Sequence, residues 1–153
     1  ICKSNLLFHF KMNISILNTP EREYVAQIDR LLHLLSPSAP EVNHHRLAEL
    51  LEDADFNLFV ARNEENMIVG MLTLTACQTI SGAKYWIEDV IVDDSCRGLG
   101  VGRALVRAAV SHVKEKETSP VIYLTSNPSR VSARNLYRSE GFEEYETGVF
   151  RIK

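Results

Sequence analysis

Three glycines and two arginines fall within seven residues of one another. Gly98, Gly100 and Gly102 alternate with larger residues, and Arg97 and Arg103 flank them. Because glycine has no Cβ, a ligand can approach the main-chain N–H groups, which at a helix start have no partner within the helix and lie at its positive end. The segment therefore predicts a phosphate site, with the two guanidinium groups adding charge-assisted hydrogen bonds. A tight strand-to-helix turn without a ligand is the alternative interpretation.

Two familiar phosphate-binding loops do not fit this spacing. A dinucleotide-binding G-x-G-x-x-G pattern would need glycine at position 103 or 105, where arginine and leucine stand. A nucleoside-triphosphate loop needs Gly-Lys followed by Ser or Thr, and the sequence contains no such triplet. The phosphate-bearing ligand must therefore be recognised in another way.

The composition predicts one globular domain with no general affinity for nucleic acid. The chain has 153 residues, 45% of them hydrophobic, and this length is enough to bury roughly two-thirds of the unfolded surface. A formal net charge of -3 offers no broad basic surface, and no apolar run is long enough to span a bilayer. Cys2, Cys77 and Cys96 fit neither a disulfide framework nor a metal cluster, which favours a reducing, cytoplasmic setting and no metal.

The predicted elements follow the order β-α-α-β-β-β-α-β-α-β, an α/β (α+β) arrangement. Residues 1–11 have neither a Met start nor a signal-peptide plan, so we expect an extension that is not part of the fold and a single domain over 12–153. A three-stranded meander followed by a β-α-β crossover predicts a mixed sheet covered by helices. The strands are expected at 13–17, 58–61, 67–78, 84–93, 121–124 and 143–152. The first helix is expected to have Thr19 as N-cap and Pro20 as first helical residue, and to bury a stripe of Val25, Ile28, Leu32 and Leu35. The other helices are expected from Asn43 to about Glu52, from the glycines to about Lys116, and over 132–140.

Two motifs resemble those of the GNAT superfamily of acetyl-coenzyme A-dependent N-acyltransferases. Residues 97–102, Arg-Gly-Leu-Gly-Val-Gly, are similar to its Arg/Gln-x-x-Gly-x-Gly/Ala motif, and residues 133–142 are similar to its Ala-x-x-x-Tyr-x-x-x-Gly-Phe segment. The resemblance implies a central sheet splayed between its fourth and fifth strands. Pantetheine would lie in that cleft, bonded to the backbone of Val90, Ile91 and Val92. The pyrophosphate would lie on the amides of Arg97, Gly98, Leu99, Gly100, Val101 and Gly102.

Acyl transfer from a thioester to an amine needs a proton acceptor for the amine and a proton donor for the departing thiolate. Glu88 or Asp89, adjacent on one expected strand and on opposite faces of it, can accept the proton through water, and Glu88 is the first choice. The family motif places Tyr137 near the coenzyme sulfur, as general acid. A structural carboxylate and a core tyrosine are the plainer interpretations of these residues.

Arg130 departs from the family pattern. Many relatives carry Asn at this position, three residues before the motif alanine, for a contact to pantetheine. Asn127 or Ser129 can replace that contact, and Arg130 can reach a coenzyme phosphate or lie in solvent. Cys96, before the glycines, is either an acyl-accepting thiol or, in our preferred interpretation, an incidental one.

The resemblance implies an N-acetyltransferase that moves an acetyl group from acetyl-CoA directly to a primary amine of a small metabolite or protein, without a metal, and that can be a homodimer. The alternatives are a regulatory module that binds acyl-CoA without turnover, and a binder of nucleotide phosphates. Release of thiol from acetyl-CoA distinguishes the first from the second. Protection by ATP rather than CoA would indicate the third. The sequence does not identify the acceptor, because acceptor pockets are formed by variable loops.

Overall fold

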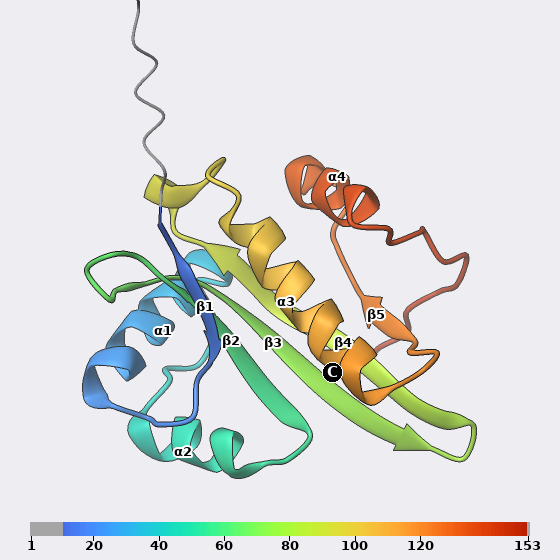
Figure 1. The fold of residues 1–153 in the computed structure, drawn as a ribbon, viewed down its shortest axis with the longest axis horizontal. Coiled ribbons are helices and arrows are strands. Elements are labelled where there is room, and N and C mark those ends of the chain that lie inside the picture. The colour runs from blue at the N-terminus through green and yellow to red at the C-terminus, as the bar shows by residue number, and fades with distance from the viewer. Residues whose placement is uncertain (1–10, 153) are drawn as a thin grey trace, which may run out of the picture.

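Helices cover both faces of a five-stranded sheet in the computed structural model, which describes residues 11–152 (Figure 1). The strands are β1 (Asn13–Ile16), β2 (Phe56–Arg62), β3 (Ile68–Thr79), β4 (Gly82–Val92) and β5 (Ile122–Leu124). The helices are α1 (Arg22–Leu35), α2 (His44–Glu52), α3 (Val101–Lys116) and α4 (Val131–Ser139), with a short 3-10 helix, η1 (Asp94–Cys96), before α3.

The sheet has the order β1-β2-β3-β4-β5 and is mixed. β1 to β4 pair antiparallel in sequence order, and β5 joins β4 in parallel after the α3 crossover. This confirms the expected meander and β-α-β unit. The extension expected over residues 1–11 lies, apart from Lys11, outside the described residues and stays a prediction.

The core has two parts, one on each face of the sheet. α3 crosses one face, while α1 and α2 pack on the other (Figure 1). α3 buries one stripe against the sheet, at the spacing of a single helix face, and burying each of its larger side chains contributes about 1.5–3 kcal/mol. The stripe consists of Val101, Leu105, Val106, Ala109 and Val113.

The first turn of α3 lies unusually close to β3 because β3 carries a glycine there. A Cβ on Gly70 would lie 2.9 Å from Val101 Cγ1 and 3.2 Å from the Ile91 carbonyl oxygen. Such contacts would push α3 away from the sheet. Gly70 therefore fixes where α3 begins, and with it the position of residues 97–102 before α3, which we call the glycine segment.

α1 starts two residues later than the sequence predicts, at Arg22, with Glu21 as N-cap. The expected cap at Thr19 was wrong, because its hydroxyl donates to the Glu21 carboxylate, 3.4 Å away, and Pro20 stays outside the helix. In contrast, Asn43 caps α2 as expected, since its side chain accepts a hydrogen bond from the Arg46 N–H.

α1 also buries Gln27 and Leu31, which the expected stripe omitted. The Gln27 side-chain oxygen accepts a hydrogen bond of 2.7 Å from the Ile68 N–H at the start of β3. The β2–β3 register shifts at Ala61 and Arg62, opposite this position. A buried polar side chain thus completes the hydrogen bonding of an irregular strand end.

The final strand expected over 143–152 was wrong, because this segment follows α4 without joining the sheet (Figure 1). The Glu144 carboxylate binds Arg134, at 2.7 Å, and Arg138, which ties the segment to α4. The Thr147 N–H donates locally to the Tyr145 carbonyl, 2.9 Å away. These contacts hold the segment without any pairing to β5.

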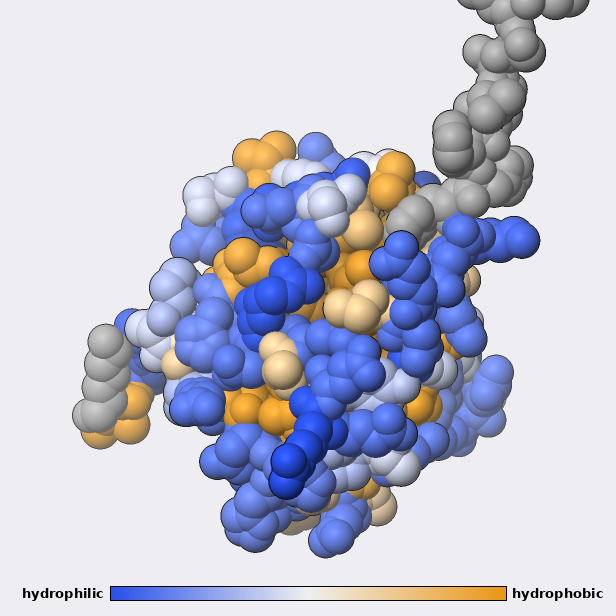
Figure 2. Space-filling model, turned by 90° about the vertical axis from the view of Figure 1, so that its left-hand side faces the viewer, coloured by the Kyte–Doolittle hydropathy of each residue, from blue (hydrophilic) through white to orange (hydrophobic). Residues whose placement is uncertain are grey.

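The surface on the side of α1 and the β2–β3 turn is polar over most of its area, and its hydrophobic residues form separate patches (Figure 2). This agrees with an amphipathic α1 whose apolar stripe faces the sheet. Within residues 11–152, every helix falls short of the length and hydrophobicity that crossing a membrane requires.

Candidate active site

A cleft of about 940 Å³ opens where β4 and β5 separate. β5 pairs with β4 only as far as Ile87 and Leu124, so among residues 11–152 no strand pairs with the rest of β4 on that side, which we call the free part of β4. This confirms the expected splay. The free part of β4, the glycine segment with the first turn of α3, and the loop before α4 with one face of α4 form the walls.

Most residues predicted to hold a coenzyme line this cleft. They are Val90, Ile91, Val92, Arg97, Gly98, Gly100, Val101, Gly102, Arg103 and Arg130. Tyr137 lines it as well, whereas Leu99, Asn127 and Glu88 do not. The Asn127 side chain accepts hydrogen bonds from the Ser129 N–H (2.9 Å) and hydroxyl (2.8 Å), so it stabilises its own loop.

β4 is bulged at the point where the splay begins. Thr73 of β3 is opposite Glu88 and Met71 is opposite Ile91, so two residues of β4 face one residue of β3. Asp89 occupies the bulge with a φ of 50°, a left-handed conformation. Side-chain alternation therefore breaks here, and the expectation that Glu88 and Asp89 lie on opposite faces of a regular strand does not apply.

The glycine segment leaves several amides free to bind an anion. Gly98 (φ 77°) and Gly100 (φ 84°) are both left-handed, and Gly100 is the N-cap of α3 without a side-chain cap. The first intrahelical bond here runs from the Ala104 N–H to the Gly100 carbonyl, so the N–H groups of the first turn have no acceptor in the helix. The Arg97 and Leu99 N–H groups donate to the preceding turn at 3.4 Å. Two of the six predicted amides are thus weakly engaged.

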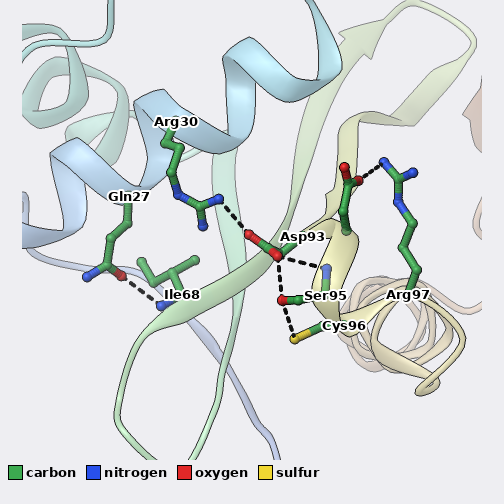
Figure 3. Close-up of polar contacts among 8 residues, drawn as sticks. Gln27, Arg30, Ile68, Asp93, Ser95, Cys96 and Arg97 are labelled. Carbon is green, nitrogen blue, oxygen red and sulfur yellow. Dashed lines mark hydrogen bonds and ion pairs between the residues drawn. The ribbon is translucent and has the colours of Figure 1, made fainter.

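An ion pair fixes the start of this segment to α1 (Figure 3). Asp93, which follows β4, accepts from Arg30 Nη1 at 2.5 Å and from the Ser95 N–H and hydroxyl at 3.0 and 2.6 Å. The Ser95 hydroxyl and then Arg30 lower the pKa of Asp93 to about 2. Arg97 extends from η1 and pairs with Asp94 at 2.6 Å (Figure 3).

A second carboxylate connects α3 to the end of α4. Glu140 lies 3.2 Å from Arg103 Nε and 2.7 Å from Arg107 Nε, and these charges lower its pKa, with the Arg107 hydrogen bond as the largest cause. Arg103 also donates to the Ser139 hydroxyl at 3.2 Å. This network holds α4 beside α3 and keeps the predicted phosphate ligand Arg103 at the rim of the cleft.

Arg130 reaches from the loop before α4 across the cleft. Its Nη2 donates to the Val90 carbonyl on the free part of β4, 3.3 Å away. Tyr137 lies on α4 and is buried, with 6% of its surface exposed. Its ring packs against Phe142. Burial raises the pKa of the Tyr137 hydroxyl, and the charge of Arg130 opposes that rise.

Two carboxylates stand beside the splay. Glu88 is exposed, yet the surrounding protein displaces enough water to raise the pKa of its carboxyl, and the neighbouring Asp89 raises it further. The buried Thr73 hydroxyl donates to Asp89 Oδ2 at 3.2 Å. Asp89 is therefore anchored in the bulge, while the Glu88 side chain is exposed.

A further cavity of about 750 Å³ lies between β5, α4 and the segment after α4, and it shares Tyr137 with the cleft. Trp86 stacks on Tyr123 in this region with ring centroids 5.0 Å apart. Trp86 lines this cavity, whereas Tyr85 does not. Tyr85 is buried, and its hydroxyl donates to Glu117.

One wall of the cleft consists of residues that were not among the predicted site residues. Ser132, Asn135, Leu136 and Ser139 line it from α4. They recur at the three- and four-residue spacing of one helix face, a signal that was present in the sequence. Cys96 also lines the cleft but is buried, with Sγ 3.7 Å from the Ser95 hydroxyl.

Comparisons with known proteins agree with this geometry. Residues 28–142 match the model of the acetyltransferase (GNAT) family. Human N-acetyltransferase 8B is 31% identical over 96 residues, which are 61% of this chain and 41% of that protein, so the chain spans under half of that relative.

Solved structures share the fold. A putative acetyltransferase from Agrobacterium tumefaciens has a TM-score of 0.79 at 24% identity, over 92% of this chain and 99% of that one. The aminoglycoside N-acetyltransferase AAC(6')-Iy in complex with CoA has a TM-score of 0.77 at 21% identity, over 94% and 95% of the two chains. With the splayed sheet, the glycine segment and the family match together, the chain belongs to the GNAT family of acetyltransferases.

Proposed function

We propose that the protein transfers an acetyl group from acetyl-CoA to a primary amine. The observation that carries this proposal is the continuous cleft that joins the free backbone of β4, the unpaired amides at the start of α3 and the buried Tyr137. One end suits a diphosphate and the other a thioester. The family match and a fold shared with a CoA-bound acetyltransferase support the same ligand.

The coenzyme lies along β4 in this proposal. The pyrophosphate accepts hydrogen bonds from the amides of the glycine segment, at the positive end of α3. Arg97 and Arg103 are paired with carboxylates at the rim, and each guanidinium has further donors that can reach a phosphate. Pantetheine pairs with the backbone of Val90, Ile91 and Val92 like an additional strand.

The reaction is a direct transfer. The neutral amine attacks the thioester carbonyl, a C–N bond forms, and the C–S bond breaks as the coenzyme leaves. Glu88 accepts the amine proton through water, and main-chain N–H groups near Ile91 and Val92 stabilise the oxyanion. Tyr137 donates the proton that the thiolate requires, and recovers one from solvent. Tyr137 lines the cleft, where the coenzyme sulfur can reach its hydroxyl.

Two observations support Glu88 rather than Asp89 as the base. The raised pKa of Glu88 brings it closer to a useful range for accepting a proton, while Asp89 is held by Thr73. Both residues lie on the free part of β4, so the choice rests on the pKa of Glu88 and on the bond that holds Asp89. A cytoplasmic setting and a homodimer stay predictions from the sequence.

The test measures thiol release from acetyl-CoA with a panel of amines: polyamines, aminosugars, aryl-alkylamines and peptides with free amino groups. Amine-dependent release supports the proposal. Protection by CoA in a thermal melt without release for any amine would instead indicate a non-catalytic acyl-CoA module. Stronger protection by ATP than by CoA would contradict both.

A further inference from the structure

We infer that Arg130 binds the sulfur of the departing coenzyme and stabilises it as a thiolate, rather than binding a phosphate. This inference rests on the proposed function and concerns the same cleft. It gives the positive charge of Arg130 a role in the departure of the thiolate, the step for which the proposed acid, Tyr137, is poorly matched.

The position of Arg130 along β4 carries the first part of the argument. Its guanidinium donates to the Val90 carbonyl, whereas the glycine segment begins after Asp93. Extended strand rises about 3.3 Å per residue, so the end of β4 lies about 7 Å beyond Val90, and η1 separates it from the glycine segment. A coenzyme whose pyrophosphate lies on the glycine segment therefore presents its pantetheine, and not its phosphates, at Val90.

The surroundings of Tyr137 carry the second part. Arg130 and Tyr137 line the same cleft, and the charge of Arg130 acts on the Tyr137 hydroxyl. A phenol with an ordinary pKa near 10 is a weak acid toward a thiolate whose conjugate acid has a pKa near 8.5, and burial weakens it further. A cation within reach of the sulfur lowers the need for a complete proton transfer during C–S cleavage.

The geometry of the guanidinium allows both contacts. It has five N–H donors, and one bond to Val90 leaves the others for the sulfur. Arg130 is also the N-cap of α4, and Val131, Ser132 and Ala133 of the first turn line the cleft at the positive end of the helix. The proton balance is unchanged: the thiolate leaves paired with Arg130 and is protonated afterwards, by Tyr137 or by solvent.

The test compares CoA with desulfo-CoA, in which hydrogen replaces the thiol. Affinities are measured by calorimetry at pH 6.5, where a thiol is protonated, and at pH 9.0, where an ordinary thiol is mostly ionised. For the unaltered protein, we expect the affinity ratio of CoA to desulfo-CoA to rise about tenfold between these pH values, the effect of one charge-assisted hydrogen bond. Arg130→Gln should abolish the rise, and Arg130→Lys should retain most of it.

Two matched controls accompany these variants. Arg97→Gln removes a cation at the glycine segment, and we expect it to weaken CoA and desulfo-CoA equally. Arg138→Gln removes a cation from α4 that pairs with Glu144 beyond the cleft, and we expect no change in the ratio. Arg130→Lys keeps the experiment informative if Arg130→Gln folds poorly in a thermal melt.

The outcomes separate this inference from the proposed function. If Arg130→Gln weakens both ligands equally at both pH values, Arg130 binds a phosphate and the inference is overturned. An unchanged rise in that variant, or no rise in the unaltered protein, also overturns it. If the unaltered protein binds neither ligand, the proposed function itself fails.

Discussion

Arg30 of α1 and Asp93 at the end of β4 are joined by a 2.5 Å ion pair, although they are 63 residues apart in sequence (Figure 3). Asp93 also binds the N–H and hydroxyl of Ser95, and so caps η1. The Asp93 carboxylate thus ties the backbone that leads into the glycine segment both to α1, through Arg30, and to η1, through Ser95. The precision of the predicted phosphate site depends on a helix that does not contribute to it.

Asp93→Asn should lower the free energy of unfolding by about 2 kcal/mol at pH 7, since a pKa near 2 compares with an ordinary value near 3.9 and each unit corresponds to 1.36 kcal/mol. A carboxyl whose pKa is depressed in the folded state stabilises above its unfolded pKa. That contribution is lost as the pH falls from about 4 toward 2. Urea unfolding between pH 7 and pH 3 should therefore show the two proteins converging in acid. Asp94→Asn, which breaks only the exposed pair with Arg97, should cost less than about 1 kcal/mol.

Much of the fold follows from local signals in the sequence. The meander and crossover were predictable because each strand is a distinct apolar run bounded by turn residues, as at Asn63–Asn66 and Gly82. The glycine segment was predictable because left-handed backbone at Gly98 and Gly100 requires that residue type. The splay was inferred from the family resemblance, and the short β5 confirms it.

What the sequence did not predict depends on contacts between distant residues. The bulge at Asp89 arises from the register between β3 and β4, and Asp89 is not a residue type that marks it plainly. The Arg130 bond to Val90 spans the cleft and has no local signal. The segment 143–152 has a strand-like pattern, yet Glu144 draws it to α4 through two arginines. Tertiary contacts overrode local propensity in each case.

Gly100→Ala should weaken CoA binding about tenfold and lower stability by about 1–2 kcal/mol. A Cβ there meets no atom within 4 Å, so the cost comes from the left-handed backbone and from the amides that tilt as it relaxes. Gly82→Ala is the matched control, because Gly82 also has positive φ and open space but is the first residue of β4, next to the β3–β4 turn. It should lower the melting temperature with no change in CoA affinity. If both variants bind CoA with equal affinity, the glycine segment does not bind the coenzyme.

Tyr137→Phe should reduce kcat about 10- to 100-fold while CoA affinity changes less than threefold, because it removes a proton donor and keeps the buried ring. Tyr85→Phe is its control. Tyr85, which lies on β4, is also a buried tyrosine with a raised pKa, but its hydroxyl binds Glu117 away from the cleft. Steady-state kinetics and calorimetry on both variants distinguish the two sites. Unchanged turnover in Tyr137→Phe would remove this hydroxyl from the mechanism.

Glu88→Gln should lower kcat/KM about 100-fold, and it should remove the acid limb of the pH profile. In the unaltered protein that limb lies above the ordinary glutamate pKa, because burial and the charge of Asp89 raise the pKa of Glu88. The base works only when ionised, so activity rises with pH through this value. Asp89→Asn provides the decisive comparison: removing its charge should shift the limb to lower pH and leave most of the activity, since Glu88 remains. If Asp89→Asn instead abolishes activity and Glu88→Gln retains it, with both variants folded, Asp89 is the base, and the carboxylate held by Thr73 in the bulge performs the proton transfer.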